Sequence, residues 1–310
     1  EQDYNDALAV CEKIGIPLYR IDFVKEYWDY VFTYFLDELK RGRTPNPDIM
    51  CNKYIKFDMF AKKAHELGAD YIATGHYARI KNHKLLRGVD SNKDQTYFLS
   101  QLSKDQLKNV LFPVGDLEKS EVRKIAEEYN LITAHKKDST GICFIGERNF
   151  KEFLQNYLPN IPGNIINIET NEEMGTHIGL MYYTIGQRRG LNIGGTKNRC
   201  YVVGKDLNKN ILYVSDDEEE KYLYSDSCLL EMVNWIGGDK IENCSAKFRY
   251  RQPDNEVHLE FLENGEILVH YHNVASVTPG QACVFYNGEE CLGGGIIKEV
   301  RKNGEKLWYL

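Results

Sequence analysis

Two cysteines of this chain lie in polar, turn-forming surroundings that are unusual for core cysteines. Cys51 stands in the segment GRTPNPDIMCNKYIKF (42–57), and Cys143 stands in DSTGICFIGERNF (138–150). If the fold brings the two thiols together, one can act as a nucleophile while the other carries sulfur or forms a transient disulfide with it. The two segments therefore predict sulfur chemistry.

Cys51 is expected at or just before a helix N-terminus, where exposed N–H groups and the helix dipole favour the thiolate. Asp48 lies shortly before it in a proline-stiffened loop and could act as acid or base toward a substrate. The alternative is that Asp48 is only the helix N-cap and Cys51 a small buried residue. Glycines around Cys143 indicate a loop that could swing a thiol or persulfide into a site, and the alternative is a cysteine packed against Phe144.

The eight cysteines (11, 51, 143, 200, 228, 244, 283 and 291) are widely spaced, and the sequence contains no C-x-x-C. This spacing argues against a structural zinc site and against the disulfide framework of small secreted proteins. We therefore expect no metal ligands among them and a reducing, cytoplasmic compartment. No run of roughly 18 apolar residues occurs, so no membrane span is expected.

The segment TGHY (74–77) follows the apolar run DYIA, so it should lie at the carboxyl end of a parallel strand, where open α/β sheets bind ligands. Gly75 would let a nucleotide approach the backbone, and His76 could donate a hydrogen bond to a substrate. Alternatively, Gly75 only makes a turn and His76 only satisfies a carbonyl group. The polar segment NKDQTYF (92–98) suits phosphate or ribose contacts and equally suits helix capping.

The formal net charge of −7 argues at first against a nucleic-acid partner, but the acidic run DDEEE (216–220) contributes much of it. Phosphate binding depends on local potential, so a basic face remains possible. In KFRYRQ (247–252), strand alternation would place Lys247, Arg249 and Arg251 on one face, which is either an RNA surface or a solvated face. Basic residues also cluster at positions 41/43, 136/137 and 188/189.

The first 148 residues alternate helical and strand patterns, which is typical of a parallel α/β sheet. Ser120 is a plausible N-cap for the last of the expected helices. Helices are expected at 4–14, 28–40, 53–67 and 121–129, and strands at 16–23 and 70–75.

Residues 149–210 are rich in Gly, Pro and β-formers, which predicts a small β-containing central domain. From 211 to 310 the pattern is all-β, because Val257, Leu259 and Phe261 alternate with polar residues as in a half-buried strand. Asn-Gly pairs at 264–265, 287–288 and 303–304 indicate hairpins. Repeated hairpins predict a small barrel.

Together these motifs resemble those of one family, the tRNA-specific 2-thiouridylases, which replace O2 of the wobble uridine (position 34) of tRNA with sulfur. The resemblance runs from residue 1 to about residue 300. It rests on the segments GRTPNPDIMCNKYIKF, DYIATGHYAR, LLRGVDSNKDQTYFLSQL, LFPVGDLEKSEVRKIA, KKDSTGICFIGER, GLMYYTIGQRRGL, FRYRQ and TPGQACVFYNGEECLGGGII.

The resemblance implies three domains: an N-terminally incomplete, parallel-sheet adenine-nucleotide domain of the pyrophosphatase-loop type (1–148), a central domain (149–210) and a C-terminal β-barrel (211–310). Cys51 then matches the catalytic nucleophile and Cys143 the residue that receives persulfide sulfur. Asp48 matches the acid or base, and Gly75 an ATP contact. The positions that match tRNA contacts are Asn46, Pro47, Asp48, His76, Lys93, Asp94, Gln95, Arg249, Tyr250 and Gln281.

The resemblance also implies a mechanism. ATP, with Mg²⁺ neutralising its pyrophosphate, adenylates O2 of the uracil, and sulfur from a Cys143 persulfide then replaces it at C2. Cys51 releases that sulfur and forms a disulfide with Cys143 for external reduction; alternatively, hydrosulfide freed by Cys51 makes the attack. The implied partners are tRNA, whose target base must leave the anticodon stack, and a persulfide-carrying sulfur-donor protein. No tightly bound metal and no membrane are implied.

One departure concerns the family's pyrophosphate-binding loop, of the form S-G-G-x-D-S, which does not occur in these 310 residues. We therefore expect that a leading segment is missing and that these residues alone do not adenylate a substrate. The rival interpretations are a non-catalytic tRNA-binding or sulfur-relay protein that has lost its ATP loop, and a dithiol redox enzyme, which the lack of C-x-x-C disfavours. An S-G-G-x-D-S motif encoded within roughly 70–90 codons upstream of Glu1 would decide for the enzyme.

Overall fold

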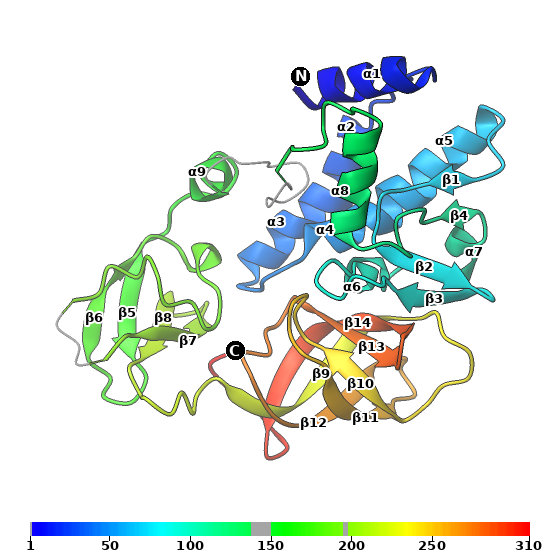
Figure 1. The fold of residues 1–310 in the computed structure, drawn as a ribbon. Helices are drawn as coiled ribbons and strands as arrows, with labels where there is room; N and C mark the ends of the chain where they lie inside the picture. The colour runs from blue at the N-terminus through cyan, green and yellow to red at the C-terminus, as the bar shows by residue number, and fades with distance from the viewer. Residues whose placement is uncertain (1, 138–149, 195–197) are drawn as a thin grey trace.

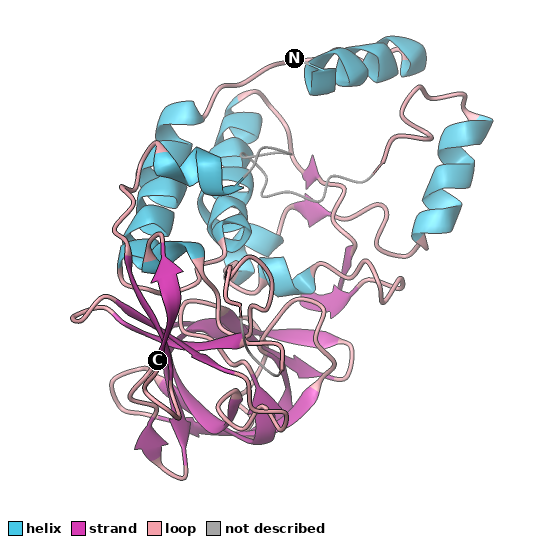
Figure 2. Ribbon diagram, turned by 90° about the vertical axis from the view of Figure 1, so that its left-hand side faces the viewer, coloured by secondary structure: helices cyan, strands magenta, loops and turns pink. Residues whose placement is uncertain are grey.

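The computed structural model describes residues 2–137, 150–194 and 198–310. Helices gather in the N-terminal part and lie over a barrel built by the C-terminal part, as Figures 1 and 2 both show. A smaller sheet from the middle of the chain stands beside the barrel (Figure 1). The arrangement confirms the predicted fold class, an α/β part followed by a β-containing central part and a C-terminal barrel.

Two long helical segments follow the first helix, α1 (Gln2–Ile14). One runs without a break through α2 (Val24–Tyr27), the π-helical η1 (Trp28–Phe32) and α3 (Thr33–Lys40), as predicted for 28–40. The other runs through α4 (Pro47–Met50), the π-helical η2 (Cys51–Phe60) and α5 (Ala61–Glu66). It begins at Pro47 rather than at residue 53, because Asn46 caps it and proline suits the first helical turn.

The N-terminal part has little sheet among its described residues. Strand β1 (Ile72–Ala73) pairs in parallel with β4 (Val110–Leu111), which confirms a short version of the strand expected at 70–75. The strand expected at 16–23 is wrong: these residues form no strand and most are exposed, with Tyr19 77% exposed. An isolated strand has no partner for its backbone N–H and C=O groups, and no described strand lies paired with this segment.

Three shorter helices complete the N-terminal part: α6 (Thr96–Leu99), α7 (Lys104–Leu107) and α8 (Lys119–Glu128). The helix expected at 121–129 begins two residues earlier, and its N-cap is Glu118 rather than Ser120. The reason is a capping box, in which the backbone N–H of Glu118 donates to Oε2 of Glu121 at 2.8 Å.

The central part holds helix α9 (Phe150–Gln155), a short 3₁₀ turn η3 (Leu180–Tyr182) and a four-stranded sheet. The strands stand in the order β6-β5-β8-β7. Strand β8 pairs in parallel with β5 and antiparallel with β7. The bounds of the four strands are β5 (Gly163–Asn167), β6 (Glu173–His177), β7 (Tyr201–Asp206) and β8 (Ile211–Ser215).

The C-terminal part is a closed barrel of six strands in the order β13-β10-β11-β12-β9-β14, with β14 pairing back onto β13. A hairpin from the N-terminal part joins it, because β3 pairs with β14 through Leu86 and Glu290. The bounds are β2 (Ala78–Lys81), β3 (Lys84–Arg87), β9 (Tyr224–Trp235), β10 (Asn243–Lys247), β11 (Asn255–Phe261), β12 (Ile267–Ala275), β13 (Ala282–Asn287), β14 (Glu290–Lys302) and β15 (Glu305–Lys306).

The three predicted Asn-Gly hairpins are confirmed, since each pair lies at the junction of two neighbouring antiparallel strands. The predicted alternation of β11 is confirmed as well, with Val257 and Leu259 buried between exposed polar residues. No described helix is long and apolar enough to cross a membrane.

The predicted alternation in KFRYRQ is wrong. Strand β10 ends at Lys247, and the next residues form a turn in which the N–H of Gln252 donates to the carbonyl of Arg249 at 3.1 Å. The side chain of Gln252 stabilises this turn by accepting from the N–H of Phe248 at 3.0 Å. Lys247, Arg249 and Arg251 therefore do not form one basic face of a strand.

Candidate active site

The helix that carries Cys51 begins with a well-defined cap. Oδ1 of Asn46 accepts a hydrogen bond from the N–H of Asp48 at 3.1 Å, and Pro47 occupies the first helical position. Asn46, and not Asp48, is therefore the N-cap. Cys51 lies in the second turn, where its N–H donates to the carbonyl of Pro47, so it is not at the helix N-terminus as expected.

Cys51 is 4% exposed and packs in an apolar cluster that the helical part and the barrel share. It starts the π-helical stretch η2, a rare helix form that occurs often at functional sites. Asp48 precedes it by about one turn, so the carboxylate and the thiol lie on neighbouring positions of one helix face. Cys143 and its predicted pairing with Cys51 lie outside the described residues.

The loop before this helix contacts the barrel. The side-chain amide of Gln281 donates from Nε2 to the carbonyl of Thr44 at 2.6 Å. The N–H of Thr44 in turn donates to the carbonyl of Pro279 at 2.9 Å. Gln281, predicted from the barrel sequence, is thus brought next to the segment that carries Asn46 and Asp48.

The end of strand β1 lies against the same helix. Gly75 is exposed, and a Cβ at its position would meet nothing within 4 Å, so the backbone there is open to close approach by a ligand. The ring of His76 lies 5.6 Å from that of Phe57 on η2, and its Nδ1 is 2.8 Å from Oγ1 of Thr74. Burial, with a smaller effect of the Lys56 charge, lowers the pKa of His76 to about 3, so its ring is neutral near pH 7.

Two residues of the polar segment 92–98 that were predicted to contact RNA use their side chains to hydrogen-bond backbone N–H groups of the protein. The buried carboxylate of Asp94 accepts from the N–H of Gly88 at 3.1 Å, and from the N–H and the hydroxyl of Thr96. Oε1 of Gln95 accepts from the N–H of Tyr77 at 2.9 Å. Lys93 is half-buried at the start of this turn. Asp94 thus holds Thr96, the first residue of α6, although the N-cap position is Gln95, whose side chain holds the residue after His76 instead.

Tyr250 of the barrel is connected to the neighbour of Cys51. Its ring lies 4.4 Å from that of Phe98, and the carbonyl of Phe98 accepts from Nδ2 of Asn52 at 3.0 Å. Asn52 was not singled out from the sequence, although it lies within a quoted motif. It is 2% exposed, and within the described part of the chain its Oδ1 has no hydrogen-bond partner. Only the three-dimensional contact with Phe98 identifies it.

Arg249 lies apart from the Cys51 helix, at the junction of the barrel and the central part. Its Nη2 donates to the carbonyl of Ser276 at 2.9 Å, to that of Ile185 at 3.2 Å, and to Oγ1 of Thr278 at 3.4 Å. Burial lowers the pKa of the guanidinium, partly offset by Tyr97.

The predicted basic clusters are largely paired with acidic side chains. Ion pairs join Arg43 to Glu38, Arg188 to Glu220, and Lys136 to Asp3. Lys247 is 14% exposed and lies 3.9 Å from Asp254. Each of these positive charges is thus offset locally, which weakens the attraction that such clusters offer to RNA phosphates.

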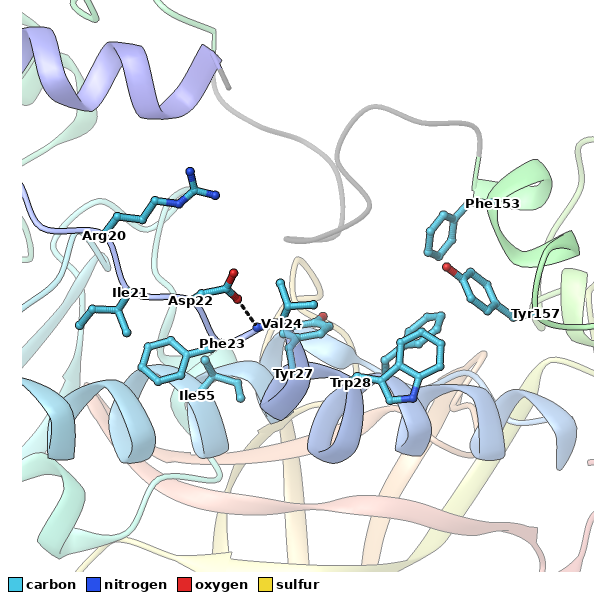
Figure 3. Close-up of a pocket in the computed structure, with 11 residues that line it drawn as sticks. Arg20, Ile21, Asp22, Phe23, Val24, Tyr27, Trp28, Ile55, Phe153 and Tyr157 are labelled. Atoms are coloured by element: carbon cyan, nitrogen blue, oxygen red, sulfur yellow. Dashed lines mark hydrogen bonds between the residues drawn. The ribbon is translucent and has the colours of Figure 1, made fainter.

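An apolar pocket of about 650 Å³ lies beside the helix of Cys51 (Figure 3). Ile55, one turn after Cys51, lines it together with Trp28 of η1. Phe153 of α9 and Tyr157, just after that helix, line another side. Arg20 is among its few charged residues. A volume of this size and an aromatic lining suit a small ligand with a planar ring. In the described ranges, no group of three or more His, Cys, Asp or Glu residues could hold a metal ion.

Family models match three consecutive parts of the chain. Residues 1–147 match the tRNA methyl transferase HUP domain, residues 151–216 the tRNA methyl transferase PRC-barrel domain, and residues 225–297 the aminomethyltransferase beta-barrel domain. These matches follow the helical part, the four-stranded sheet and the six-stranded barrel in order.

Relatives align with the whole chain. It is 58% identical over 312 residues to the tRNA-specific 2-thiouridylase MnmA of Mycoplasmopsis synoviae, covering 100% of this chain and 84% of the relative. It is 58% identical over 317 residues to MnmA 2 of Geobacillus kaustophilus (100% and 85%), and 57% identical over 320 residues to MnmA of Staphylococcus epidermidis (100% and 86%). The domain models are named for methyl transfer, but the relatives matched over the whole chain are named for thiolation. The chain belongs to the tRNA-specific 2-thiouridylase family.

Proposed function

We propose that the protein transfers sulfur to C2 of the wobble uridine of a tRNA and so forms 2-thiouridine. The observation that carries this proposal is the identity of 57–58%, over the whole chain, to proteins named tRNA-specific 2-thiouridylases. The Asn46-capped helix supports it, because it presents a carboxylate, Asp48, and a thiol, Cys51, on consecutive turns.

Cys51 is the proposed nucleophile. Its thiolate attacks the sulfur of Cys143, which carries the transferred sulfur as a persulfide. In one order, the outer sulfur has already bonded to C2 as AMP left, and the attack by Cys51 breaks the S–S bond and leaves that sulfur on C2. In the other order, the attack releases hydrosulfide, which then bonds to C2 as AMP leaves. In both orders a Cys51–Cys143 disulfide forms. An external thiol reductant returns two electrons and reopens this disulfide. Asp48 holds or moves the proton at the bound base.

ATP is the proposed cosubstrate, and when bound it makes the uracil oxygen a better leaving group. The open backbone at Gly75 and, separately, the aromatic-lined pocket beside Ile55 support a nucleotide site next to this helix. The described residues do not fit a metal site, so none is assigned to Mg²⁺ and no step depends on it.

The proposed RNA contacts fall into two groups. Asn46, Pro47, Asp48, His76, Lys93 and Tyr250 are proposed to touch the tRNA around the target base. Asp94, Gln95, Arg249 and Gln281 each use the side chain in hydrogen bonds to more distant parts of the protein, so we propose that they also shape this surface. A persulfide-carrying protein is the proposed sulfur donor, and the cytoplasm the proposed compartment.

The test is thiolation by the protein produced from its natural gene, given unmodified tRNA, ATP, a persulfide as the sulfur source and a thiol reductant. Mass spectrometry of the digested tRNA should show 2-thiouridine, and about one AMP should appear per sulfur transferred. The alternative, a tRNA-binding or sulfur-relay protein without ATP chemistry, predicts bound tRNA with neither product. The similarity to the relatives, which covers the whole chain, gives no support to the expectation that these 310 residues alone are inactive, and the same assay measures their activity.

A further inference from the structure

The loop in front of the Cys51 helix is held through both backbone groups of one residue. Thr44 donates its N–H to the carbonyl of Pro279 at 2.9 Å, and its own carbonyl accepts from Nε2 of Gln281 at 2.6 Å. Both partners belong to the turn 278–281 of the barrel, which we call the barrel turn. A loop normally satisfies these groups with water, so this pairing fixes its position against the barrel.

The barrel turn is itself anchored. The N–H of Gly280 donates to the carbonyl of Ile297 on β14 at 2.8 Å, and the N–H of Ile297 donates to the carbonyl of Gln281 at 2.8 Å. Gly280 has φ +92°, and a Cβ there would lie 2.8 Å from the backbone nitrogen of Thr44. No side chain fits between the turn and the loop, so the two backbones meet at a fixed separation.

A second contact holds the residue before Thr44. Nη1 of Arg43 lies 3.2 Å from Oε2 of Glu38 on α3 and 2.5 Å from Oε1 of Glu231 on β9. The side chains of Arg43 and Glu38 are 19% and 4% exposed, so these ion pairs are shielded from solvent. They join the helical part, the loop and the barrel at one point.

The backbone between Thr44 and Asp48 has little conformational freedom. Pro45 and Pro47 are both buried, and proline fixes φ near −65° at each position. Asn46 between them is fixed by its hydrogen bond to the N–H of Asp48. A displacement of Thr44 is therefore passed on to Asp48 and to the start of the helix of Cys51.

We propose that Gln281 is a positioning residue, which holds Thr44 and thereby sets the place of the Asn46–Asp48 segment. Its amide donor is already directed at the Thr44 carbonyl at the short distance of 2.6 Å. The kinetic test of this inference depends on the proposed sulfur transfer. The second test depends on the fold alone.

The kinetic test uses Gln281→Met, which keeps the length of the side chain and removes the donor. Single-turnover thiolation at saturating tRNA should fall about 10–100-fold, since small misplacements of reacting groups have effects of this size. The dissociation constant for tRNA should stay within about twofold. Gly280→Ala should act in the same direction, because its Cβ would push against Thr44.

The matched control is Asn234→Ala. Nδ2 of Asn234 also joins the barrel to the helical part, donating to the carbonyls of Ser100 and Leu102 at 2.8 Å, but away from Thr44. This variant should lose stability while keeping the saturating rate within about twofold. A Gln281→Met protein that binds tRNA at least tenfold more weakly but keeps the saturating rate would overturn the proposal in favour of direct RNA contact.

The second test needs no activity. Hydrogen exchange of the backbone amides of 44–50 should be faster in Gln281→Met than in the natural protein, and unchanged in Asn234→Ala. Unchanged exchange in Gln281→Met would overturn the positioning role. If the natural protein makes no 2-thiouridine, the proposed function fails, and the exchange experiment still decides whether Gln281 holds the loop.

Discussion

The imidazole ring of His76 packs against the phenyl ring of Phe57, with the two centroids 5.6 Å apart. His76 follows strand β1 and Phe57 belongs to η2, so this contact joins the end of the sheet to the helix of Cys51. Phe112 adds a second ring at 6.1 Å. In these surroundings His76 can offer a neutral hydrogen-bonding ring to a ligand but not a positive charge, because burial lowers its pKa to about 3.

Replacing His76 with glutamine should make the free energy of unfolding less sensitive to acid. The folded pKa of about 3 lies below the unfolded value of about 6.5, so between these values only the unfolded chain takes up a proton. The contribution of His76 is therefore complete above pH 6.5 and falls by about 1.4 kcal/mol per pH unit below it. Urea unfolding at about pH 7.5, 6 and 5 should show a steeper loss for the natural protein than for His76→Gln.

The control for this experiment is His65→Gln. His65 is exposed at the end of the helix that carries Cys51, so this variant shows the effect of the same histidine-to-glutamine change at an exposed position. Equal slopes in the natural protein and in His76→Gln would contradict the buried, neutral state of His76.

Asp94→Ala should lower the free energy of unfolding, and this effect should not depend on a contact with RNA. The carboxylate satisfies the N–H of Gly88 and both the N–H and the hydroxyl of Thr96, all in a buried site. Removing it leaves these donors without a partner, at a cost on the order of 3 kcal/mol in the free energy of unfolding. Chemical denaturation measures this loss.

Asn92→Ala, an exposed change in the same turn, should alter the free energy of unfolding by less than about 0.5 kcal/mol. If Asp94→Ala is as stable as Asn92→Ala but binds tRNA more weakly, the role of Asp94 lies at the RNA and not in the turn.

Arg249→Ala should lower the thermal stability and leave the salt dependence of tRNA binding unchanged. The guanidinium donates through Nη2 to Ser276, Ile185 and Thr278, which are protein groups, so we expect it to support the fold rather than to pair with a phosphate. Removal of a side chain that does pair with a phosphate would reduce the slope of log affinity against log salt by roughly 0.7–0.9. Binding titrations over a salt series therefore distinguish the two roles.

The comparison variant is Arg251→Ala, since Arg251 is exposed in the same turn. A reduced slope of log affinity against log salt in Arg249→Ala would instead support a contact between Arg249 and an RNA phosphate. A reduced slope in Arg251→Ala alone would place the phosphate contact at the outer side of the turn.

The parts of the fold that the sequence predicted are those with strong local signals. The Asn-Gly hairpins and the alternation of Val257 and Leu259 are properties of a few neighbouring residues, and both are present in the barrel. The strand at 16–23 was wrong because its apolar composition says nothing about a pairing partner, and without one the segment stays irregular. The turn at 249–252 was missed because Gln252 stabilises it through a side chain, a contact that strand alternation does not register.

The residues of the candidate site also divide into those that a local sequence pattern indicates and those that only the fold brings together. The sequence singled out Asn46, Asp48 and Cys51, but it placed Cys51 at the helix end because the cap formed by Asn46 and Pro47 was not recognised. Asn52 and the contact between Gln281 and Thr44 depend on residues far apart in the chain, so no local pattern could indicate them.

The measurement that tests the central claim most directly is 2-thiouridine formation by single-cysteine variants of the protein produced from its natural gene. With a persulfide as the sulfur source, Cys51→Ser and Cys143→Ser should each abolish the product, because each removes one of the two protein thiols between which the disulfide forms. Replacements of Cys11, Cys200 and Cys283 should leave the rate within about threefold. Product formed at the natural rate by Cys51→Ser would contradict the account.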